Sequence, residues 1–280
     1  MRRSISLAGK SESTLTNYAR CLAHMGFHFQ QDLLSLDDES ILDYLHHLKK
    51  KHQTPSASFF KHTVYGLRFL FRLYNLKESR VILPSIEQPK KLPVVLSEQE
   101  VKRLLEAPKL LKHRLIIGLL YGCGLRNFEL GKLKITDVNL ERLQLHVQQG
   151  KNRKDRYLPL CSMLARGIRS YIEAVQPVTY LFNGNNPSGE PVPLSTRGVQ
   201  WAIKEARQKA GIKKQVTAHT LRHSYATHLL EMGLDIFSLK DLLGHQSIQT
   251  TLVYLHVSQS KRVQVFSPLE KLYPQGGERA

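Results

Sequence analysis

The feature that most limits how this chain can fold is a run of prolines near residue 90. Three prolines fall within residues 83–93, where they interrupt any helical period, because proline lacks the backbone N–H that a helix uses. These prolines are Pro84, Pro89 and Pro93. We therefore interpret residues 84–94 as a linker between an N-terminal domain, residues 1–83, and a larger domain, residues 95–280.

The N-terminal segment carries three apolar stripes with helical spacing. The stripes are Leu15, Tyr18, Leu22 and Met25; then Ile41, Leu45 and Leu48; then Phe60, Val64, Leu67 and Phe71. The acidic residues 37–39 precede the second stripe, which suits a helix N-terminus. Lys61, Arg68 and Arg72 occupy another face of the third segment, where they either track phosphates or form a solvated face. The pattern predicts a small helical domain.

The second domain is predicted to be mainly α-helical with a small β-sheet or hairpin. Residues 97–100, Ser-Glu-Gln-Glu, form a capping-box pattern ahead of an amphipathic helix. Alternating apolar residues at 143–147 and 157–160 flank a basic turn, which indicates a β-hairpin. Further helices are predicted at 112–121, from Arg126 or Asn127 to 132, and at 162–175, 196–210, 219–232, 235–243 and 247–256.

The charge balance favours a polyanionic partner. The chain has a formal net charge of +18, and residues 89–280 carry 29 basic and 15 acidic side chains against 12 and 8 in residues 1–88. Such an excess indicates nucleic acid most simply, and a solvated basic surface is the alternative. The excess lies mainly in the second domain.

Cysteine usage and hydropathy indicate a cytoplasmic protein. Cys21, Cys123 and Cys161 are odd in number and show no C-x-x-C spacing, so neither a disulfide framework nor a cysteine-based zinc site is predicted. The longest apolar run, Leu115 to Leu125, is far short of the roughly 20 residues that span a bilayer. No apolar export segment follows the N-terminal Met-Arg-Arg, so we expect no membrane association.

Two turns in the second domain present cationic side chains. Gly122 and Gly124 allow the backbone to turn ahead of Arg126, whose planar fork at a helix N-terminus can bind a phosphate. A helix-breaking turn with a surface arginine is the alternative. Lys151 leads a basic cluster at the hairpin tip, where a lysine can reach a groove and act as a proton donor. On its own, such a cluster is more often a nonspecific DNA contact or a solvated loop.

Two further features lie closer to the C-terminus. His219 and Arg222 are three residues apart, so on a helix they share one face. His219 and His223 also have a metal-like spacing, but no His-Glu-x-x-His pattern or sulfur ligand accompanies them, so no metal site is predicted. His245 follows Leu-Leu-Gly, and Tyr254 stands nine residues later among leucine and valine, where a tyrosine by itself indicates core packing.

In their order and spacing these pieces resemble the tyrosine recombinase, or phage integrase, family, with an Xer-like layout. The succession is Gly-Leu-Arg…Glu-Leu, Gly-Lys-x-x-Lys-x-Arg, His-x-Leu-Arg-His-Ser-x-Ala-Thr-His-Leu, Leu-Leu-Gly-His and Thr-Thr-x-x-Tyr. It covers residues 95–257 without a large insertion, and five pieces in the correct order make a specific signal. Residues 1–83 resemble the SAM-like core-binding domain of the family only in size, position and helical character.

The resemblance implies roles for six residues. It makes Arg126 and Arg222 the arginines that hold the non-bridging phosphate oxygens, Lys151 the hairpin lysine, His219 and His245 the two histidines, and Tyr254 the nucleophile. It also implies a two-domain clamp around double-stranded DNA that carries specific recombination sites, with a homotetramer on two sites as the active assembly.

These six residue types suit the cleavage of a phosphodiester bond. The transition state of phosphodiester cleavage gathers negative charge on oxygens that fixed arginines can bind, so we expect no metal and no cofactor. Tyr254 would form a covalent 3′-phosphotyrosine, with Lys151 as proton donor to the leaving 5′ oxygen and His219 as proton acceptor. Lys154 lies in the same turn as an alternative to Lys151.

Two other functions remain open at this stage. A type IB topoisomerase shares the active-site logic without needing paired sites, and a catalytically silent DNA-binding protein shares the charge. The biological task, by resemblance, is integration, excision or resolution of DNA, including that of mobile genetic elements. The basic faces of residues 56–74 and 196–214 are the candidate DNA contacts. An apolar strip, Val263, Val265 and Phe266, is expected to dock on a neighbouring subunit or to fold back in cis.

Overall fold

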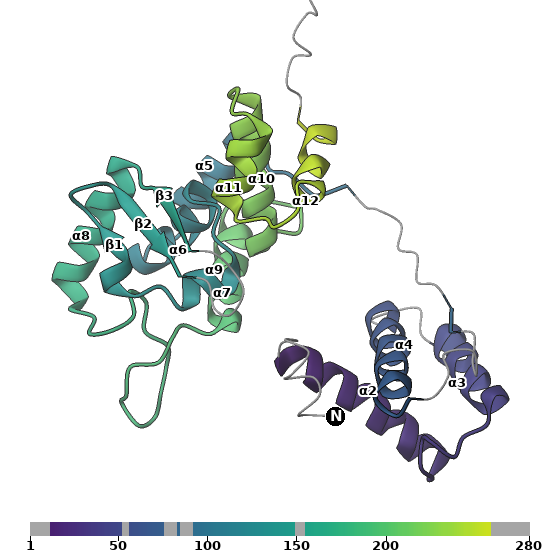
Figure 1. Ribbon diagram of the computed structural model, residues 1–280. Helices are drawn as coiled ribbons and strands as arrows, with labels where there is room; N and C mark the ends of the chain where they lie inside the picture. The colour runs from purple at the N-terminus through teal and green to yellow at the C-terminus, as the bar shows by residue number, and fades with distance from the viewer. Residues whose placement is uncertain (1–11, 52–55, 76–82, 85–91, 149–154, 259–280) are drawn as a thin grey trace, which may run out of the picture. The chain divides into compact units, whose positions relative to one another are not determined.

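The computed structural model contains two compact units, residues 1–90 and 91–280 (Figure 1). It describes residues 12–51, 56–75, 83–84, 92–148 and 155–258. The predicted linker falls mostly outside the described residues, so its bounds stay a prediction. None of the described helices is long and apolar enough to cross a membrane.

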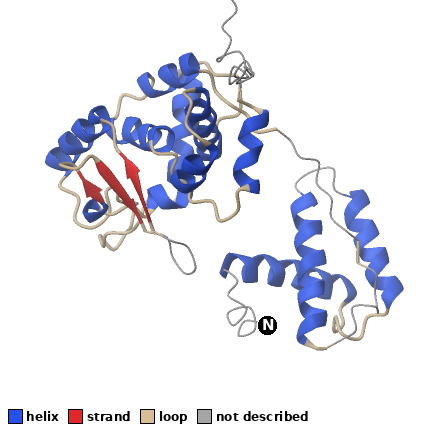
Figure 2. Cartoon of the chain, turned by 45° about the horizontal axis from the view of Figure 1, so that its top comes forward, coloured by secondary structure: helices blue, strands red, loops and turns tan. Residues whose placement is uncertain are grey.

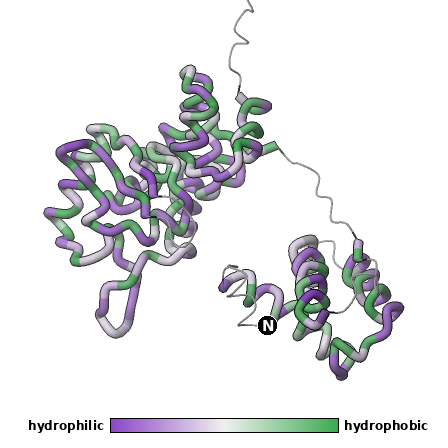
Figure 3. Tube along the Cα trace, viewed as in Figure 1, coloured by the Kyte–Doolittle hydropathy of each residue, from purple (hydrophilic) through white to green (hydrophobic). Residues whose placement is uncertain are grey.

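In the described residues of the N-terminal unit, the three predicted helices are present as α2 (Glu12–Phe29), α3 (Asp38–Lys51) and α4 (Ser56–Leu73). Most residues of the apolar stripes face inward and form one small core, and Figure 3 shows how apolar and polar residues alternate along these helices. Met25, Ile41 and Leu67 are among its fully buried side chains. Burial of one face on each helix stabilises a unit of this size.

The larger unit is organised around α6 (Leu111–Gly122), in which the successive residues 115–120 are all buried. It contacts α5 (Glu98–Glu106), α8 (Ser162–Val175), α9 (Thr196–Lys209) and α10 (Ala218–Glu231), so its side chains are buried on several sides. The predicted capping box at α5 is confirmed, because the Glu100 amide donates to Ser97 Oγ and the Ser97 amide to Glu100 Oε2.

A three-stranded antiparallel sheet lies at one edge of this unit, as Figure 2 shows. The predicted hairpin is confirmed as β2 (Gln144–Val147) and β3 (Arg156–Pro159). A third strand, β1 (Val138–Asn139), follows a 3-10 turn, η1 (Ile135–Asp137), and was not predicted. The hairpin tip with Lys151 lies outside the described residues.

The C-terminal part forms a second, smaller core. Here α10 packs against α11 (Ile236–Leu243) and against a final segment in which α12 (Gln249–Leu252) continues as the 3-10 turn η2 (Val253–His256). The helix predicted at 247–256 is therefore present but changes type within its length. Tyr225, Leu239, Leu243 and Tyr254 are buried together in this core, which places Tyr254 beside α10.

Candidate active site

Three arginines converge on the C-terminal end of α11. Each donates a hydrogen bond to one of three successive carbonyl oxygens: Arg156 Nε to Leu242 at 2.8 Å, Arg222 Nη2 to Leu243 at 2.5 Å, and Arg126 Nη2 to Gly244 at 3.1 Å. These carbonyls have no partner within their own helix and lie at the negative end of its dipole, so cationic donors are favoured there. Gly244 ends the helix with a φ of +61°, which turns the chain toward His245.

The arginines come from three different elements. Arg126 is the N-cap of α7 (Asn127–Gly131), Arg156 lies in β3 and Arg222 in the first turns of α10. Arg222 and Arg156 are 3% and 8% exposed, whereas the Arg126 side chain keeps 17% of its surface accessible. Arg126 is therefore the most accessible of the three guanidinium groups.

The carboxylate of Glu129 joins two of these arginines. Arg156 donates from Nη1 and Nη2 to its two oxygens at 3.0 and 2.8 Å, and Arg126 donates from Nη1 and from its backbone N–H, both at 2.8 Å. Burial alone would raise the pKa of Glu129, but the hydrogen bonds and charges of Arg156 and Arg126 lower it to about 2. The ionised carboxylate thus fixes the plane of Arg126 relative to Arg156.

The cluster keeps an excess of positive charge. Burial, together with repulsion from Arg126 and Arg156, lowers the pKa of Arg222 to about 10, so its guanidinium group is still charged at neutral pH. Glu129 is the one carboxylate that bonds to them among the described residues. A buried cationic excess of this kind favours an anion such as a phosphodiester.

Gly124 gives the cluster its close packing. Arg222 Nη1 donates to the Gly124 carbonyl at 2.6 Å, and Gly124 has a φ of +59°, a backbone region that favours glycine. A Cβ at this position would overlap the ring of Tyr225. The turn that the sequence indicated before Arg126 is therefore a tight approach of the backbone to α10.

Tyr254 lies in η2 with 2% of its surface exposed. Its hydroxyl oxygen is 3.0 Å from Nδ1 of His223, and its ring is parallel to that of His245, with the centroids 6.4 Å apart. Burial raises the pKa of Tyr254, while Arg222 and Arg126 act in the opposite direction. The phenol is therefore protonated at neutral pH and lies within the electrostatic reach of both arginines.

His245 follows the helix end that the arginines bind. Its Nδ1 is 2.9 Å from Thr251 Oγ1. Burial, and then the charges of Arg222, Arg126 and Arg156, lower the pKa of His245 to about 4, so the ring is neutral at pH 7. A neutral imidazole beside the arginines can donate a hydrogen bond to a phosphate oxygen.

The structure brings together four of the six residues that the sequence nominated: Arg126, Arg222, His245 and Tyr254. His219 lies on α10 with an exposed side chain, and its ring centroid is 6.3 Å from that of His223. Lys151 falls outside the described residues. In the part of the chain that the structure describes, no group of three or more His, Cys, Asp or Glu side chains could hold a metal ion.

The sequence assigned no role to three members of this site, Glu129, Arg156 and His223, although each stands in one of the family motifs. Glu129 follows Arg126 by three residues at a helix start, a spacing typical of a capping partner. Arg156 ends the Gly-Lys-x-x-Lys-x-Arg motif, but nothing in the spacing indicated its bond to Glu129. The sequence presented His223 only as a metal candidate, and its pairing with a tyrosine 31 positions later cannot be read from spacing.

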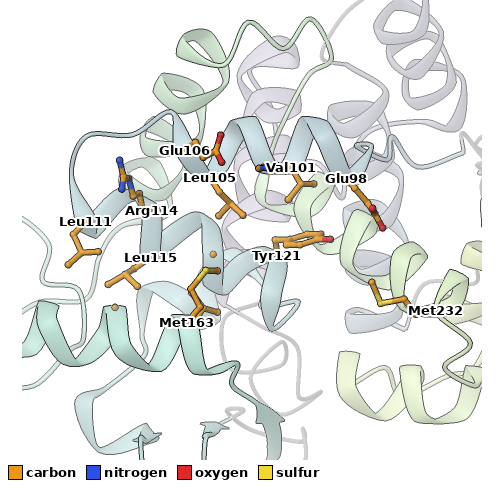
Figure 4. Close-up of a pocket in the computed structure, with 14 residues that line it drawn as sticks. Glu98, Val101, Leu105, Glu106, Leu111, Arg114, Leu115, Tyr121, Met163 and Met232 are labelled. Atoms are coloured by element: carbon orange, nitrogen blue, oxygen red, sulfur yellow. The ribbon is translucent and has the colours of Figure 1, made fainter.

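A separate cavity of about 810 Å³ lies between α5, α6 and α8. Figure 4 shows Leu105, Leu115 and Met163 facing it, and its lining is mainly apolar. None of the arginines, histidines or tyrosines of the cluster at α11 lines it. The cavity is therefore not part of the candidate active site.

Comparison with known proteins covers both units. Residues 94–261 match the model of the phage integrase family, and residues 1–79 match the N-terminal SAM-like domain of phage integrases. The tyrosine recombinase XerA of Thermococcus kodakarensis is 38% identical over 259 residues, which are 91% of this chain and 88% of that protein. The tyrosine recombinase XerD of Staphylococcus aureus is 36% identical over 97% of this chain and 95% of its own length.

Solved structures agree in fold. A crystal structure of XerA recombinase matches with a TM-score of 0.56 and 28% identity, covering 99% of this chain and 96% of that one. XerH recombinase bound to a palindromic difH substrate in a post-cleavage complex matches with a TM-score of 0.72 and 22% identity, over 92% and 78% of the two chains. The helical SAM-like domain and the mixed helical domain with a small sheet are thus confirmed.

Proposed function

Since the chain belongs to the phage integrase family, we propose that it is a site-specific recombinase that cuts and rejoins DNA through a covalent 3′-phosphotyrosine at Tyr254. The observation that carries the role of Tyr254 is its burial against α10, within the field of two arginines bound to the end of α11. Relatives named as tyrosine recombinases over most of the chain support the reaction class.

In the proposed reaction the arginines bind the scissile phosphate. Arg126 and Arg222 donate to its non-bridging oxygens and stabilise the charge that grows there as Tyr254 Oη attacks phosphorus. Glu129 and Arg156 hold Arg126 in place, and His245 adds a hydrogen bond. The bond from phosphorus to the 5′ oxygen breaks, and Lys151 supplies the proton that this oxygen needs.

The partner in this proposal is double-stranded DNA with specific recombination sites. Two solved neighbours are XerH structures in complex with difH DNA, and the net charge of +18 agrees with a DNA ligand. On α9, the exposed side chains of Arg197, Trp201 and Lys204 recur at helical spacing and form a candidate DNA contact. We propose a homotetramer on two sites as the active assembly, and the cytoplasm as its location.

The covalent link has a direct test. The protein is incubated with DNA from the region flanking its own gene, in the presence of a chelator, then denatured and examined for protein attached to a 3′ end. Wild-type protein should form the adduct, and Tyr254→Phe should bind DNA without forming it. An adduct that persists in Tyr254→Phe would refute the assignment of the nucleophile.

A second experiment separates recombination from relaxation. A supercoiled plasmid with one candidate site is compared with a plasmid that carries two. A recombinase should delete or invert the segment between two sites, whereas a topoisomerase relaxes both plasmids equally. The named relatives favour the recombinase, and equal relaxation without recombinant products would favour the topoisomerase.

A further inference from the structure

The group in contact with the Tyr254 hydroxyl is His223. Its Nδ1 lies 3.0 Å from the hydroxyl oxygen, and the two ring centroids are 5.6 Å apart. His219, one turn earlier on α10, has an exposed side chain, and no hydrogen bond joins it to Tyr254 within the described part of the chain. The sequence nominated His219 as the proton acceptor, but the contact belongs to its neighbour.

The position of His223 on α10 gives this contact a fixed geometry. Arg222 precedes it directly and donates to the Gly124 and Leu243 carbonyls. These two bonds fasten this turn of α10 to the loop before α7 and to the end of α11. One turn of α10 therefore supplies a charge next to the phosphate site and an imidazole next to the nucleophile. A proton acceptor must lie within about 2.6–3.2 Å of the proton's donor atom, and His223 meets that condition.

Burial and the charges around His223 keep its ring neutral. Burial, then His219 and Arg222, lower its pKa to about 4, and His245 and Tyr254 are the other titratable groups that face it. At neutral pH the ring carries one proton, so Nδ1 can accept a hydrogen bond when that proton is on Nε2. A phosphate bound at the arginines offsets their positive charge, which makes His223 a stronger base when DNA is bound.

We propose that His223 is the proton acceptor for Tyr254 during strand cleavage, an inference that rests on the proposed role of Tyr254 as nucleophile. The O–H bond of Tyr254 breaks and its proton moves to Nδ1 of His223 as Oη forms its bond to phosphorus. The bond from phosphorus to the 5′ oxygen breaks with its electron pair, and that oxygen takes a proton from the general acid. Rejoining runs the same transfers backward, with His223 returning the proton to the phenolate.

The test compares three histidines of the same helix. His223→Asn keeps a hydrogen-bond acceptor near the Nδ1 position but cannot take a proton at neutral pH. His219→Asn tests the rival acceptor. His228→Asn is the matched control, because His228 Nδ1 makes a comparable contact, 2.9 Å from the Tyr121 hydroxyl, in a buried place outside the cluster.

The readout is the single-turnover rate of adduct formation on a nicked duplex from the DNA flanking its own gene. We expect His223→Asn to be slower by roughly 10²–10⁴-fold, with DNA binding retained, and His228→Asn to stay within about tenfold of wild type. A duplex with sulfur in place of the 5′ bridging oxygen, whose leaving group needs no proton, should not restore the His223→Asn rate. The acid limb of the wild-type pH profile should vanish in this variant.

Three outcomes would overturn the proposal. If His223→Asn cleaves at the wild-type rate, the contact serves only packing. If the variant keeps the acid limb of the pH profile, His223 is a positioning residue. If only His219→Asn shows the large drop in cleavage rate, His219 is the proton acceptor. Failure of the proposed function would look different, because the wild type would then form no adduct or Tyr254→Phe would still form it.

Discussion

At the scale of single residues, burial and two hydrogen bonds fix the orientation of the Arg222 guanidinium group. Arg222 is 3% exposed, and both of its Nη atoms are committed to the carbonyls of Gly124 and Leu243. A guanidinium can hold two carbonyls and face a third partner, because its donors lie in one plane with fixed angles. A lysine has a single nitrogen on a flexible stem and cannot reproduce that geometry.

Arg222→Lys should therefore keep the charge but lose the cleavage. We expect the rate of adduct formation to fall by roughly 10²–10³-fold, as for removal of one preorganised donor to a transition-state oxyanion. Arg166→Lys on the exposed face of α8 is the control and should cleave normally. Single-turnover assays and a binding titration measure both quantities, and normal cleavage by Arg222→Lys would contradict the role of the planar fork.

Gly124 gives a second residue-scale prediction, now for stability. Gly124→Ala places a side chain at a φ of +59° and against the Tyr225 ring, whereas Gly211→Ala has a φ of +64° with open space around it. The second variant should cost about 1–3 kcal/mol from backbone strain alone, and the first should cost more and also slow cleavage. Denaturant unfolding measures the difference, and equal costs would show that Tyr225 yields.

Sequence patterns identified residues that stand in short motifs shared with the family, but not the contacts between distant residues. Arg126, Arg222, His245 and Tyr254 stand in short motifs, so they could be nominated without a structure. His223 stands in the same motif as Arg222, but its contact with Tyr254 could not be predicted, because Tyr254 is 31 residues away and the contact depends on how η2 packs on α10. The roles of all these residues stay predictions until the variants are measured.

At the scale of secondary structure, the end of α11 is the element that assembles the site. Its last carbonyls accept from arginines of α7, β3 and α10, so one helix terminus orients side chains that lie up to 96 residues apart in sequence, Arg126 to Arg222. Helices were predictable wherever an apolar stripe ran for several turns. The strand β1 has only two residues and η1 only three, too few for any periodicity to show.

The pair of Glu129 and Arg156 ties α7 to β3 beneath this helix end. Since the pKa of Glu129 is about 2, below its ordinary 4.5, the unfolded chain binds more protons between these values than the folded protein does. The stabilisation is therefore fully present above about pH 4.5 and is lost as the pH falls toward 2. Glu129→Gln should lack this component of the acid transition.

At neutral pH, Glu129→Gln should lower the free energy of unfolding by roughly 3–5 kcal/mol, because it leaves Arg156 charged and buried without its ionic partner. Glu100→Gln is the matched control, since its ion pair with Lys214 involves a half-exposed lysine and should cost about 1 kcal/mol or less. Urea unfolding at pH 7 and at pH 3 measures both effects. A similar loss in the two variants would mean that the buried pair contributes little.

At the scale of the whole molecule, each of the two compact units has apolar core clusters of its own. Residues 12–75 and 92–258 each bury their own apolar cluster, so each unit has the means to stay folded while bound to DNA. The net charge of +18 favours phosphate contacts, and a protein that makes 6–10 of them loses about 10³–10⁵ in affinity between 50 and 200 mM salt. Binding by this chain should show a dependence of that size.

The exposed side chains of Arg197, Trp201 and Lys204 on α9 are the residues at which this salt dependence can be tested. Lys204→Ala removes one exposed charge without disturbing the buried face of α9, which contains Val199, Ala202 and Ile203. If Lys204 contacts a phosphate, the slope of log affinity against log salt falls in magnitude by about 1, and binding weakens equally on specific and random DNA. Arg222→Lys, which preserves charge, should leave the slope unchanged, so a titration of both variants over a salt series separates the DNA-contacting surface from the site of cleavage. An unaltered slope in Lys204→Ala would place the contact elsewhere on the basic domain.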